Sequence, residues 1–308
     1  MKLYSRYIFL ILFAYVIKSC ASNKAINSEK NNITVKTFTY KKTSNKTSLD
    51  LDFYSSKYFR GKQPLIIYVH GGGFSSGKRN DAFIKKFTRN MAKKGIAVAS
   101  ISYRLTMKKY GFSCNTATYL KINAFNSASE DISLATKFLI EKSDELNIDT
   151  SNIILMGSSA GAEAVLNLTY VYNNTILPNF KYAGVIAMAG AITTVEKITE
   201  NSAIPTMLFH GVKDKLVPYN IAPHHYCKET SDGYLMLYGA KAIAEKLKEL
   251  NKSFYLYTVT DGNHSWNAKP MILCVNEILD FINTSVIQGN FQQKNVVKKE
   301  SSHNSKKS

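Results

Sequence analysis

The chain has 308 residues, 45% of them hydrophobic, which is enough to build one large buried core within a single domain. Its 40 lysines and arginines outnumber its 22 aspartates and glutamates, so the formal net charge is +18. Because this excess is spread along the chain and accompanies no arginine-rich stripe or nucleic-acid-binding motif, it indicates a solvated, lysine-rich surface. It argues against a nucleic-acid partner.

The N-terminus has the pattern of a targeting segment. Lys2 and Arg6 precede an apolar run, residues 7–17, that is too short to span a bilayer. A basic start followed by a short apolar run is typical of a signal peptide. We therefore expect residues 1–20 to be a signal peptide and leave them out of the predicted fold.

The residues around Cys20 resemble a bacterial lipobox, which has an aliphatic residue three positions before the cysteine and a small residue directly before it. Ile17 and Ser19 match this pattern, whereas Lys18 departs from the small or neutral residue usual at its position. We expect an exported envelope lipoprotein, facing the outer membrane or periplasm, that is lipidated at Cys20 and contacts the membrane only through this anchor. Residues 21–32 would form a tether. A cleaved secretion signal and an uncleaved anchor remain open alternatives.

The next part of the chain alternates between predicted strands and predicted helices. Residues 33–41 and 47–55 alternate polar and apolar positions, as antiparallel edge strands do. The apolar runs typical of buried strands are 64–69, 96–104, 152–156, 204–209 and 253–260. Helical patterns occupy 81–94, 128–146, 159–170, 236–250 and 270–284. This alternation predicts an α/β domain over residues 33–286, with a mostly parallel, twisted sheet covered by helices on both faces.

The C-terminal residues 287–308 have a different composition. They are rich in glutamine, asparagine, lysine and serine and show no apolar periodicity. Such a composition does not supply the buried apolar surface that offsets the loss of conformational entropy on folding. We expect these residues to be a disordered tail.

A glycine-rich segment follows the predicted strand 64–69. It reads His70-Gly71-Gly72-Gly73-Phe74. Consecutive glycines leave backbone N–H groups unshielded, and such groups suit the binding of a developing oxyanion. A flexible glycine turn is the alternative. We expect His70 to brace the loop rather than to transfer protons.

A second glycine-containing motif, Gly157-Ser158-Ser159-Ala160-Gly161, lies between the predicted strand 152–156 and a helical pattern. Strand, G-x-S-x-G and helix is the order of a nucleophile elbow, in which a tight, strained turn exposes one serine Oγ. By position that serine is Ser159, and Ser158 occupies the variable slot. An ordinary turn into a helix is the alternative, which the glycine-rich segment upstream disfavours.

Together the two motifs resemble those of the α/β-hydrolase superfamily, in its esterase/lipase branch with an HGGG oxyanion loop. The resemblance implies the α/β-hydrolase fold and the chain order nucleophile, acid, histidine. Asp214 lies in an H-G-x-x-D-x-x-V-P run after a strand, where the family keeps its acid, and His264 follows the last strand. The carboxylates left open as alternatives are Glu196, Glu200 and Asp232.

The resemblance also implies the chemistry. His264 would take the proton of Ser159, and Asp214 would orient the imidazole. The N–H groups of Ala160, Gly72 and Gly73 would hold the oxyanion. An acyl-enzyme would form and be hydrolysed by water, with no cofactor and no metal.

A carboxylic-ester hydrolase is the function favoured by these features, acting on short acyl esters of small molecules or carbohydrates, including acetyl and feruloyl groups. Two other classes stay open. One is a peptidase resembling the prolyl-oligopeptidase catalytic domain, against which the HGGG loop and the lack of a preceding propeller domain argue. The other is a non-catalytic binding protein on the same scaffold, against which the full set of motif residues argues.

Two inserts, residues 105–125 and 219–234, leave the C-terminal ends of strands, where open α/β sheets bind ligands. Their ring-bearing residues would either line a partly aromatic pocket or only pack the inserts; these are Tyr110, Phe112, Tyr119, His225, Tyr226 and Tyr234. His224 and His225 do not suggest a metal site, because neighbouring histidines are expected to point apart.

Three cysteines remain if Cys20 carries lipid. In an oxidising compartment Cys114, Cys227 and Cys274 would form one disulfide and leave one free thiol, and the sequence does not determine the pairing.

Overall fold

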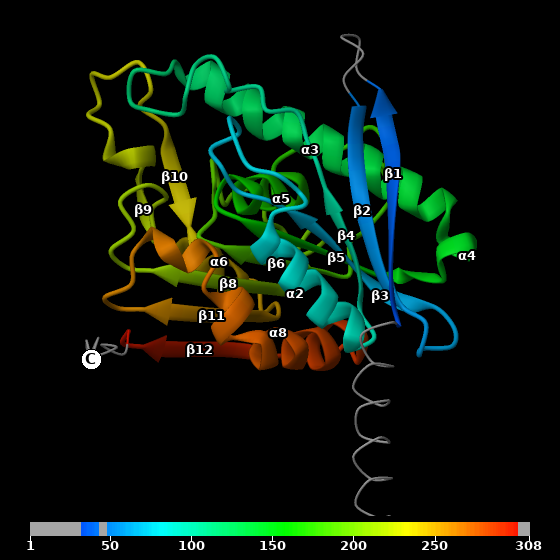
Figure 1. Ribbon diagram of the computed structural model, residues 1–308. Coiled ribbons are helices and arrows are strands. Elements are labelled where there is room, and N and C mark those ends of the chain that lie inside the picture. The colour runs from blue at the N-terminus through cyan, green and yellow to red at the C-terminus, as the bar shows by residue number, and fades with distance from the viewer. Residues whose placement is uncertain (1–31, 43–47, 301–308) are drawn as a thin grey trace, which may run out of the picture.

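The computed structural model describes residues 32–42 and 48–300, and within them a mixed nine-stranded sheet lies at the centre. Its strand order is β1-β2-β4-β3-β5-β6-β8-β11-β12. The strands from β4 to β12 run parallel, and β1 and β2 join antiparallel at one edge (Figure 1). Their bounds are β1 Ile33–Lys42, β2 Ser48–Ser56, β3 Gln63–Val69, β4 Ala97–Ile101, β5 Ile148–Ser158, β6 Gly184–Met188, β8 Thr206–Gly211, β11 Phe254–Val259 and β12 Gln293–Lys298. The predicted fold class is confirmed.

Helices cover both faces of this sheet because successive strand residues point to opposite sides. Ile66 and Tyr68 pack on the face covered by α2 (Ala82–Lys93) and α8 (Val275–Phe281). Helix α2 crosses the front of the sheet in Figure 1. Leu65 and Ile67 pack on the other face.

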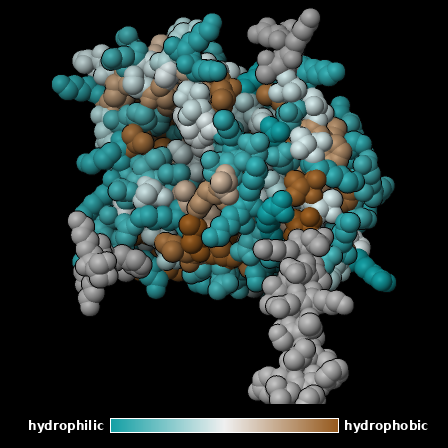
Figure 2. All heavy atoms as spheres, viewed as in Figure 1, coloured by the Kyte–Doolittle hydropathy of each residue, from teal (hydrophilic) through white to brown (hydrophobic). Residues whose placement is uncertain are grey.

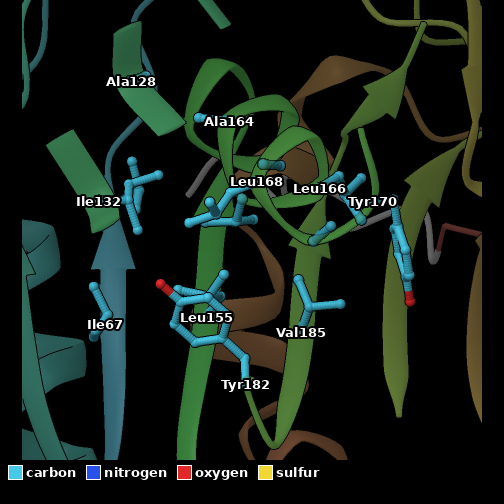
Figure 3. Packing of buried hydrophobic residues seen from close by; sticks show 14 of the residues in the cluster. Ile67, Ala128, Ile132, Leu155, Ala164, Leu166, Leu168, Tyr170, Tyr182 and Val185 are labelled. Atoms are coloured by element: carbon cyan, nitrogen blue, oxygen red, sulfur yellow. The ribbon is translucent and has the colours of Figure 1, made fainter. Parts of the chain in front are cut away.

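That second face is covered by α3 (Thr118–Glu141), α5 (Ala160–Tyr170) and α6 (Ala240–Glu249). Figure 3 shows Ile132 of α3 and Leu168 of α5 gathered with Leu155 and Val185 of the central strands. The remaining helical elements are α4 (Ser143–Leu146), α7 (Pro270–Leu273), and the short helices η1 (His224–Tyr226), η2 (His264–Asn267) and η3 (Ile282–Ile287).

Several element boundaries differ from the prediction. The helix expected over 128–146 begins ten residues earlier, at Thr118, and breaks before α4. The first residues of the helix expected over 236–250 form the strand β10 (Met236–Gly239) instead. β10 pairs with β7 (Ala191–Ile192) and β9 (Ile221–Pro223) in a small second sheet. Local composition did not reveal β10 because its partners are distant in sequence.

The prediction that residues 287–308 form a disordered tail is wrong for residues 293–298. Residues 293–298 form β12, which lies parallel to β11 at the edge of the main sheet (Figure 1). Backbone hydrogen bonding needs no apolar side chains, and Val296 adds a contact with the core on the α2 and α8 side. Residues 301–308 lie outside the described part, as do Cys20, the signal peptide 1–20 and nearly all of the tether.

The surface in Figure 2 is mostly hydrophilic on the visible face, with separate hydrophobic patches. Across the residues that the structure describes, no helix combines the length and the apolarity needed to cross a bilayer.

Candidate active site

The turn between β5 and α5 presents Ser159. This residue has φ 51° and ψ −121°, a conformation that costs free energy for any residue with a Cβ and that clusters at functional sites. Helix α5 also packs unusually close to the sheet, because a Cβ on Gly161 would lie only 2.1 Å from the carbonyl oxygen of Val69. The strained, glycine-flanked turn therefore has the geometry predicted for a nucleophile elbow.

Three of the sequence-predicted residues form one hydrogen-bonded chain. Ser159 Oγ lies 2.8 Å from His264 Nε2, and His264 Nδ1 lies 2.7 Å from Asp214 Oδ2. An ionised carboxylate only accepts hydrogen bonds, so Nδ1 carries the imidazole proton and Nε2 accepts the hydroxyl proton of Ser159. The serine is thus aligned to lose its proton to His264.

Asp214 is buried and held as a carboxylate. Its Oδ1 accepts hydrogen bonds from the backbone N–H groups of Leu216, at 2.8 Å, and Val217, at 3.1 Å. Burial by itself raises the pKa of Asp214, but hydrogen bonds from His210 and His264 outweigh it and hold that pKa well below its usual value. The acid therefore stays ionised across the neutral pH range.

His210 is a part of this site that the sequence reasoning did not assign. Its Nε2 lies 3.1 Å from the carbonyl oxygen of Val217 and 3.4 Å from Asp214 Oδ2. The side chain is fully buried. It occupies the first position of the H-G-x-x-D run, which was the available signal. Its Nε2 and the Nδ1 of His264 both approach the same carboxylate oxygen, Asp214 Oδ2.

The glycine-rich loop lies against the elbow. Gly72 has φ +117°, a left-handed conformation, and a Cβ there would lie 2.3 Å from the carbonyl oxygen of Ser76. Its own carbonyl accepts the N–H groups of Ser75, at 3.1 Å, and Ser76, at 3.0 Å, which closes the turn. Among the described residues, no hydrogen bond engages the N–H groups of Gly72, Gly73 or Ala160. These amides are the donors predicted for an oxyanion.

His70 braces this loop, as expected. Its Nδ1 lies 2.8 Å from the carbonyl oxygen of Gly71, and its ring lies 4.6 Å from that of Tyr103, centroid to centroid. The hydroxyl of Tyr103 donates to the His70 carbonyl at 2.9 Å. Burial lowers the pKa of His70, which keeps the ring neutral.

Known proteins with similar sequences are esterases and a xylanase. The BD-FAE family model matches residues 51–187. Gut esterase 1 of Caenorhabditis elegans is 30% identical over 108 residues, which cover 35% of this chain and 18% of that protein. Endo-1,4-beta-xylanase B of Butyrivibrio fibrisolvens is 22% identical over 218 residues, 66% of this chain and 32% of that one. The chain thus spans less than a third of the length of these relatives.

Solved structures show the same fold over nearly the whole described chain. Thermogutta terrifontis esterase 2, with butyrate bound, has a TM-score of 0.58 and 17% identity and covers 82% of this chain and 95% of its own. The same esterase phosphoramylated by tabun has a TM-score of 0.58 and 18% identity, covering 80% and 94%. The chain therefore has the α/β-hydrolase fold that these esterases share.

The serine beside Ser159 also has a defined contact. Ser158 Oγ donates to the carbonyl oxygen of Asn267 at 2.7 Å and lies 3.0 Å from its Oδ1. Asn267 Nδ2 in turn donates to the carbonyl oxygen of His264 at 2.5 Å. Ser158 therefore ties the elbow to η2, which carries His264. The sequence reasoning treated it only as a variable position.

The carboxylates left open as alternative acids lie elsewhere in the structure. Glu196, Glu200 and Asp232 are all exposed, and none of them contacts His264. The structure brings only Asp214 to the imidazole.

The two inserts are joined by a disulfide between Cys114 and Cys227, which leaves Cys274 as a buried free thiol. Hydrogen bonds reinforce this link: Gly233 N–H donates to the Cys114 carbonyl at 2.8 Å, and Thr118 Oγ1 donates to the Tyr234 carbonyl at 2.7 Å. The inserts thus form one unit at the C-terminal ends of the strands.

The aromatic residues of the inserts divide into two groups. Phe112 packs inward, with its ring 5.4 Å from Phe74 and 6.3 Å from His225. Tyr110, Tyr119 and Tyr226 are 58%, 64% and 48% exposed. Of the residues expected to line a partly aromatic pocket, Phe112 and His225 therefore pack against each other on the inward side, whereas these three tyrosines are exposed.

The expectation that His224 and His225 point apart is wrong. Their ring centroids lie 4.3 Å apart. The reason is the left-handed backbone at His225, φ 56°, which turns its side chain back toward its neighbour. Among the described residues, no group of three or more histidine, cysteine or carboxylate side chains is placed to hold a metal.

Proposed function

We propose that the protein is a serine carboxylic-ester hydrolase in which Ser159, His264 and Asp214 form the catalytic triad. The observation that carries this proposal is the continuous hydrogen-bonded chain from Ser159 Oγ through His264 to the buried, ionised Asp214. The esterases among its relatives and structural neighbours support the same class of reaction.

The mechanism follows from the protonation states. His264 Nε2 takes the proton of Ser159 as Oγ attacks the ester carbonyl carbon, and Asp214 stabilises the imidazolium that forms. The negative oxygen of the tetrahedral intermediate accepts hydrogen bonds from the amides of Gly72, Gly73 and Ala160. His264 then gives its proton to the departing alkoxide. Water, activated by the same imidazole, hydrolyses the acyl-enzyme and regenerates Ser159.

We propose short acyl esters as the substrates, including acetyl or feruloyl esters of carbohydrates. The two inserts at the strand ends are joined by the disulfide, and a xylanase is among the relatives. A peptidase related to prolyl-oligopeptidase and a non-catalytic binding protein remain the competing classes, and neither is favoured by a specific contact.

One assay panel separates these three classes. The purified protein is given p-nitrophenyl acetate, p-nitrophenyl butyrate and a prolyl anilide, and is treated in parallel with paraoxon before intact-mass measurement. We expect turnover of both esters, little or none of the anilide, and one phosphoryl adduct that is absent from a Ser159→Ala control. Faster cleavage of the anilide than of either ester would favour the peptidase. No turnover and no adduct would leave only the binding protein.

We further propose that the protein is exported and lipidated at Cys20. The disulfide between Cys114 and Cys227 supports export, because disulfides persist in oxidising compartments. Expressed in a bacterial host, the protein should sediment with membranes, and Cys20→Ser should move it to the soluble fraction. Cys274→Ser, which removes a buried thiol instead, serves as the control. Unchanged membrane partitioning of Cys20→Ser would exclude lipidation as the anchor.

A further inference from the structure

Three buried polar side chains near the triad have no part in the mechanism above. They are Lys121 on α3, Glu163 on α5 and His224 in η1, with exposed fractions of 0%, 2% and 1%, and we call them the polar cluster. Ionisable side chains are rarely buried to this extent unless their polar atoms are paired. Their hydrogen-bond partners therefore indicate what the cluster does.

The members of the polar cluster do not satisfy one another. Glu163 Oε1 lies 3.4 Å from His224 Nε2, yet within the described chain Oε1 accepts no hydrogen bond. His224 Nδ1 is likewise buried and unpaired there. Lys121 Nζ donates to the carbonyl oxygen of Gly233 at 2.7 Å, which uses one of its three N–H groups. Buried polar atoms are almost always hydrogen-bonded, so the cluster is built to receive a further polar group.

The two unpaired members of the polar cluster, Glu163 and His224, are neutral. Burial, followed by the charge of Asp214, raises the pKa of Glu163 well above its usual value, so the carboxyl group keeps its proton and can both donate and accept. Burial, followed by the charge of His225, lowers the pKa of His224, so that ring is also neutral. A hydroxyl group, which needs one acceptor and one or two donors, matches this set.

The polar cluster lies one helical turn from the nucleophile. Glu163 N–H donates to the Ser159 carbonyl at 2.9 Å, so the two residues are about 6 Å apart along the α5 axis. Phe112 joins the cluster to the oxyanion loop: its ring lies 4.9 Å from the His224 ring, and a Cβ on Gly73 would lie 3.7 Å from Phe112 Cβ. The cluster is therefore adjacent to the oxyanion loop.

This position identifies which part of the substrate would reach the polar cluster. The leaving alkoxide must face His264, which protonates it. An acyl chain that runs away from that imidazole would run toward the oxyanion loop and the first turn of α5. A substituent two or three carbons from the carbonyl carbon spans the distance from Ser159 to Glu163.

We propose that the polar cluster binds a hydroxyl group on the acyl chain of the substrate, so that the protein prefers short hydroxyacyl esters to unsubstituted ones. This inference rests on the proposed ester hydrolysis at Ser159. Glu163 is the specificity-determining residue, since it can donate to and accept from the same hydroxyl. His224 and Lys121 complete the hydrogen bonding.

The test compares an unsubstituted ester with esters that carry one additional hydroxyl group on the acyl chain. Methyl butyrate and the two enantiomers of methyl 3-hydroxybutyrate are hydrolysed by the full-length protein and followed by titration of released acid. We expect kcat/KM to be about tenfold higher for the better hydroxyl enantiomer than for methyl butyrate, as a hydrogen-bonding site discriminates against a substrate without its partner. The ratio of the two values does not depend on the fraction of folded enzyme.

Three variants assign the preference. Glu163→Leu should bring the ratio to about one, and Glu163→Gln, which keeps one donor and one acceptor, should preserve most of it. Thr136→Val serves as the control, because Thr136 is equally buried but pairs with Tyr182. On the alcohol side, the ratio between 2-hydroxyethyl acetate and propyl acetate should be the same in wild type and Glu163→Leu.

A wild-type ratio near one, or a preference that survives Glu163→Leu, would overturn the proposed hydroxyl site. So would an effect of Glu163→Leu confined to the alcohol-side pair. If the wild type hydrolysed none of these esters, including methyl butyrate, the ester-hydrolase function itself would fail.

Discussion

Replacing Ser159 by alanine should lower kcat for p-nitrophenyl acetate by about 10⁶-fold, because it removes the nucleophile that is in hydrogen-bond contact with His264. The thermal stability should fall little, since alanine keeps the packing contacts of α5 and leaves its first turn intact. The measurement is ester turnover together with a thermal melt of both proteins. Activity within about tenfold of wild type would mean that the elbow has been misassigned.

Ser158→Ala is the matched control for this loss. It removes a hydroxyl of the same kind one residue away, and the structure shows what that hydroxyl does: it donates to Asn267, which in turn holds the backbone of His264. We expect a loss of about tenfold or less, because the imidazole keeps its direct bonds to Ser159 and Asp214. Equal losses of activity in Ser158→Ala and Ser159→Ala would contradict the assignment of Ser159, rather than Ser158, as the nucleophile.

Replacing Asp214 by asparagine should lower kcat by about 10⁴-fold. The backbone N–H groups of Leu216 and Val217 hold the Oδ1 position, so the asparagine oxygen would take that place and its amide N–H₂ would face His264 Nδ1. Nδ1 would then have to accept, the proton would move to Nε2, and Nε2 could no longer take the proton of Ser159. His264→Ala should cost at least as much as Asp214→Asn, because triad members act as a unit.

Glu196→Gln and Asp232→Asn are the controls for the acid, and both should stay near wild type, because both side chains are exposed and away from the imidazole. A nearly active Asp214→Asn beside an inactive control variant would transfer the role of the acid to that residue. Substantial activity in His264→Ala would exclude the triad mechanism altogether.

The parts of the site that the sequence revealed are those whose chemistry demands a local pattern. The elbow needs small residues at positions 157 and 161 and a serine between them. The oxyanion loop needs glycines after a strand, since Gly72 adopts φ +117°. Asp214 and His264 follow from the order of the strands, because both lie on loops at the same end of a parallel sheet.

What the sequence did not reveal depends on contacts between distant segments. The pairing of Cys114 with Cys227 spans 113 residues, and the contact of Ser158 with Asn267 spans 109. The polar cluster likewise draws its members from three separate elements. The strand β6 was a different omission, since the apolar run Gly184-Val-Ile-Ala-Met was present in the sequence and was not assigned.

The strand β12 has a consequence for how the folded chain meets other chains. Without it, β11 would end the sheet and offer a row of unpaired N–H and C=O groups, flanked by Tyr255 and Tyr257, to any extended peptide. β12 takes that position, and its lysines at 294 and 298 place like charges along the new outermost strand. Two molecules that approached each other edge to edge at β12 would repel each other, so this strand protects the fold from edge-to-edge aggregation.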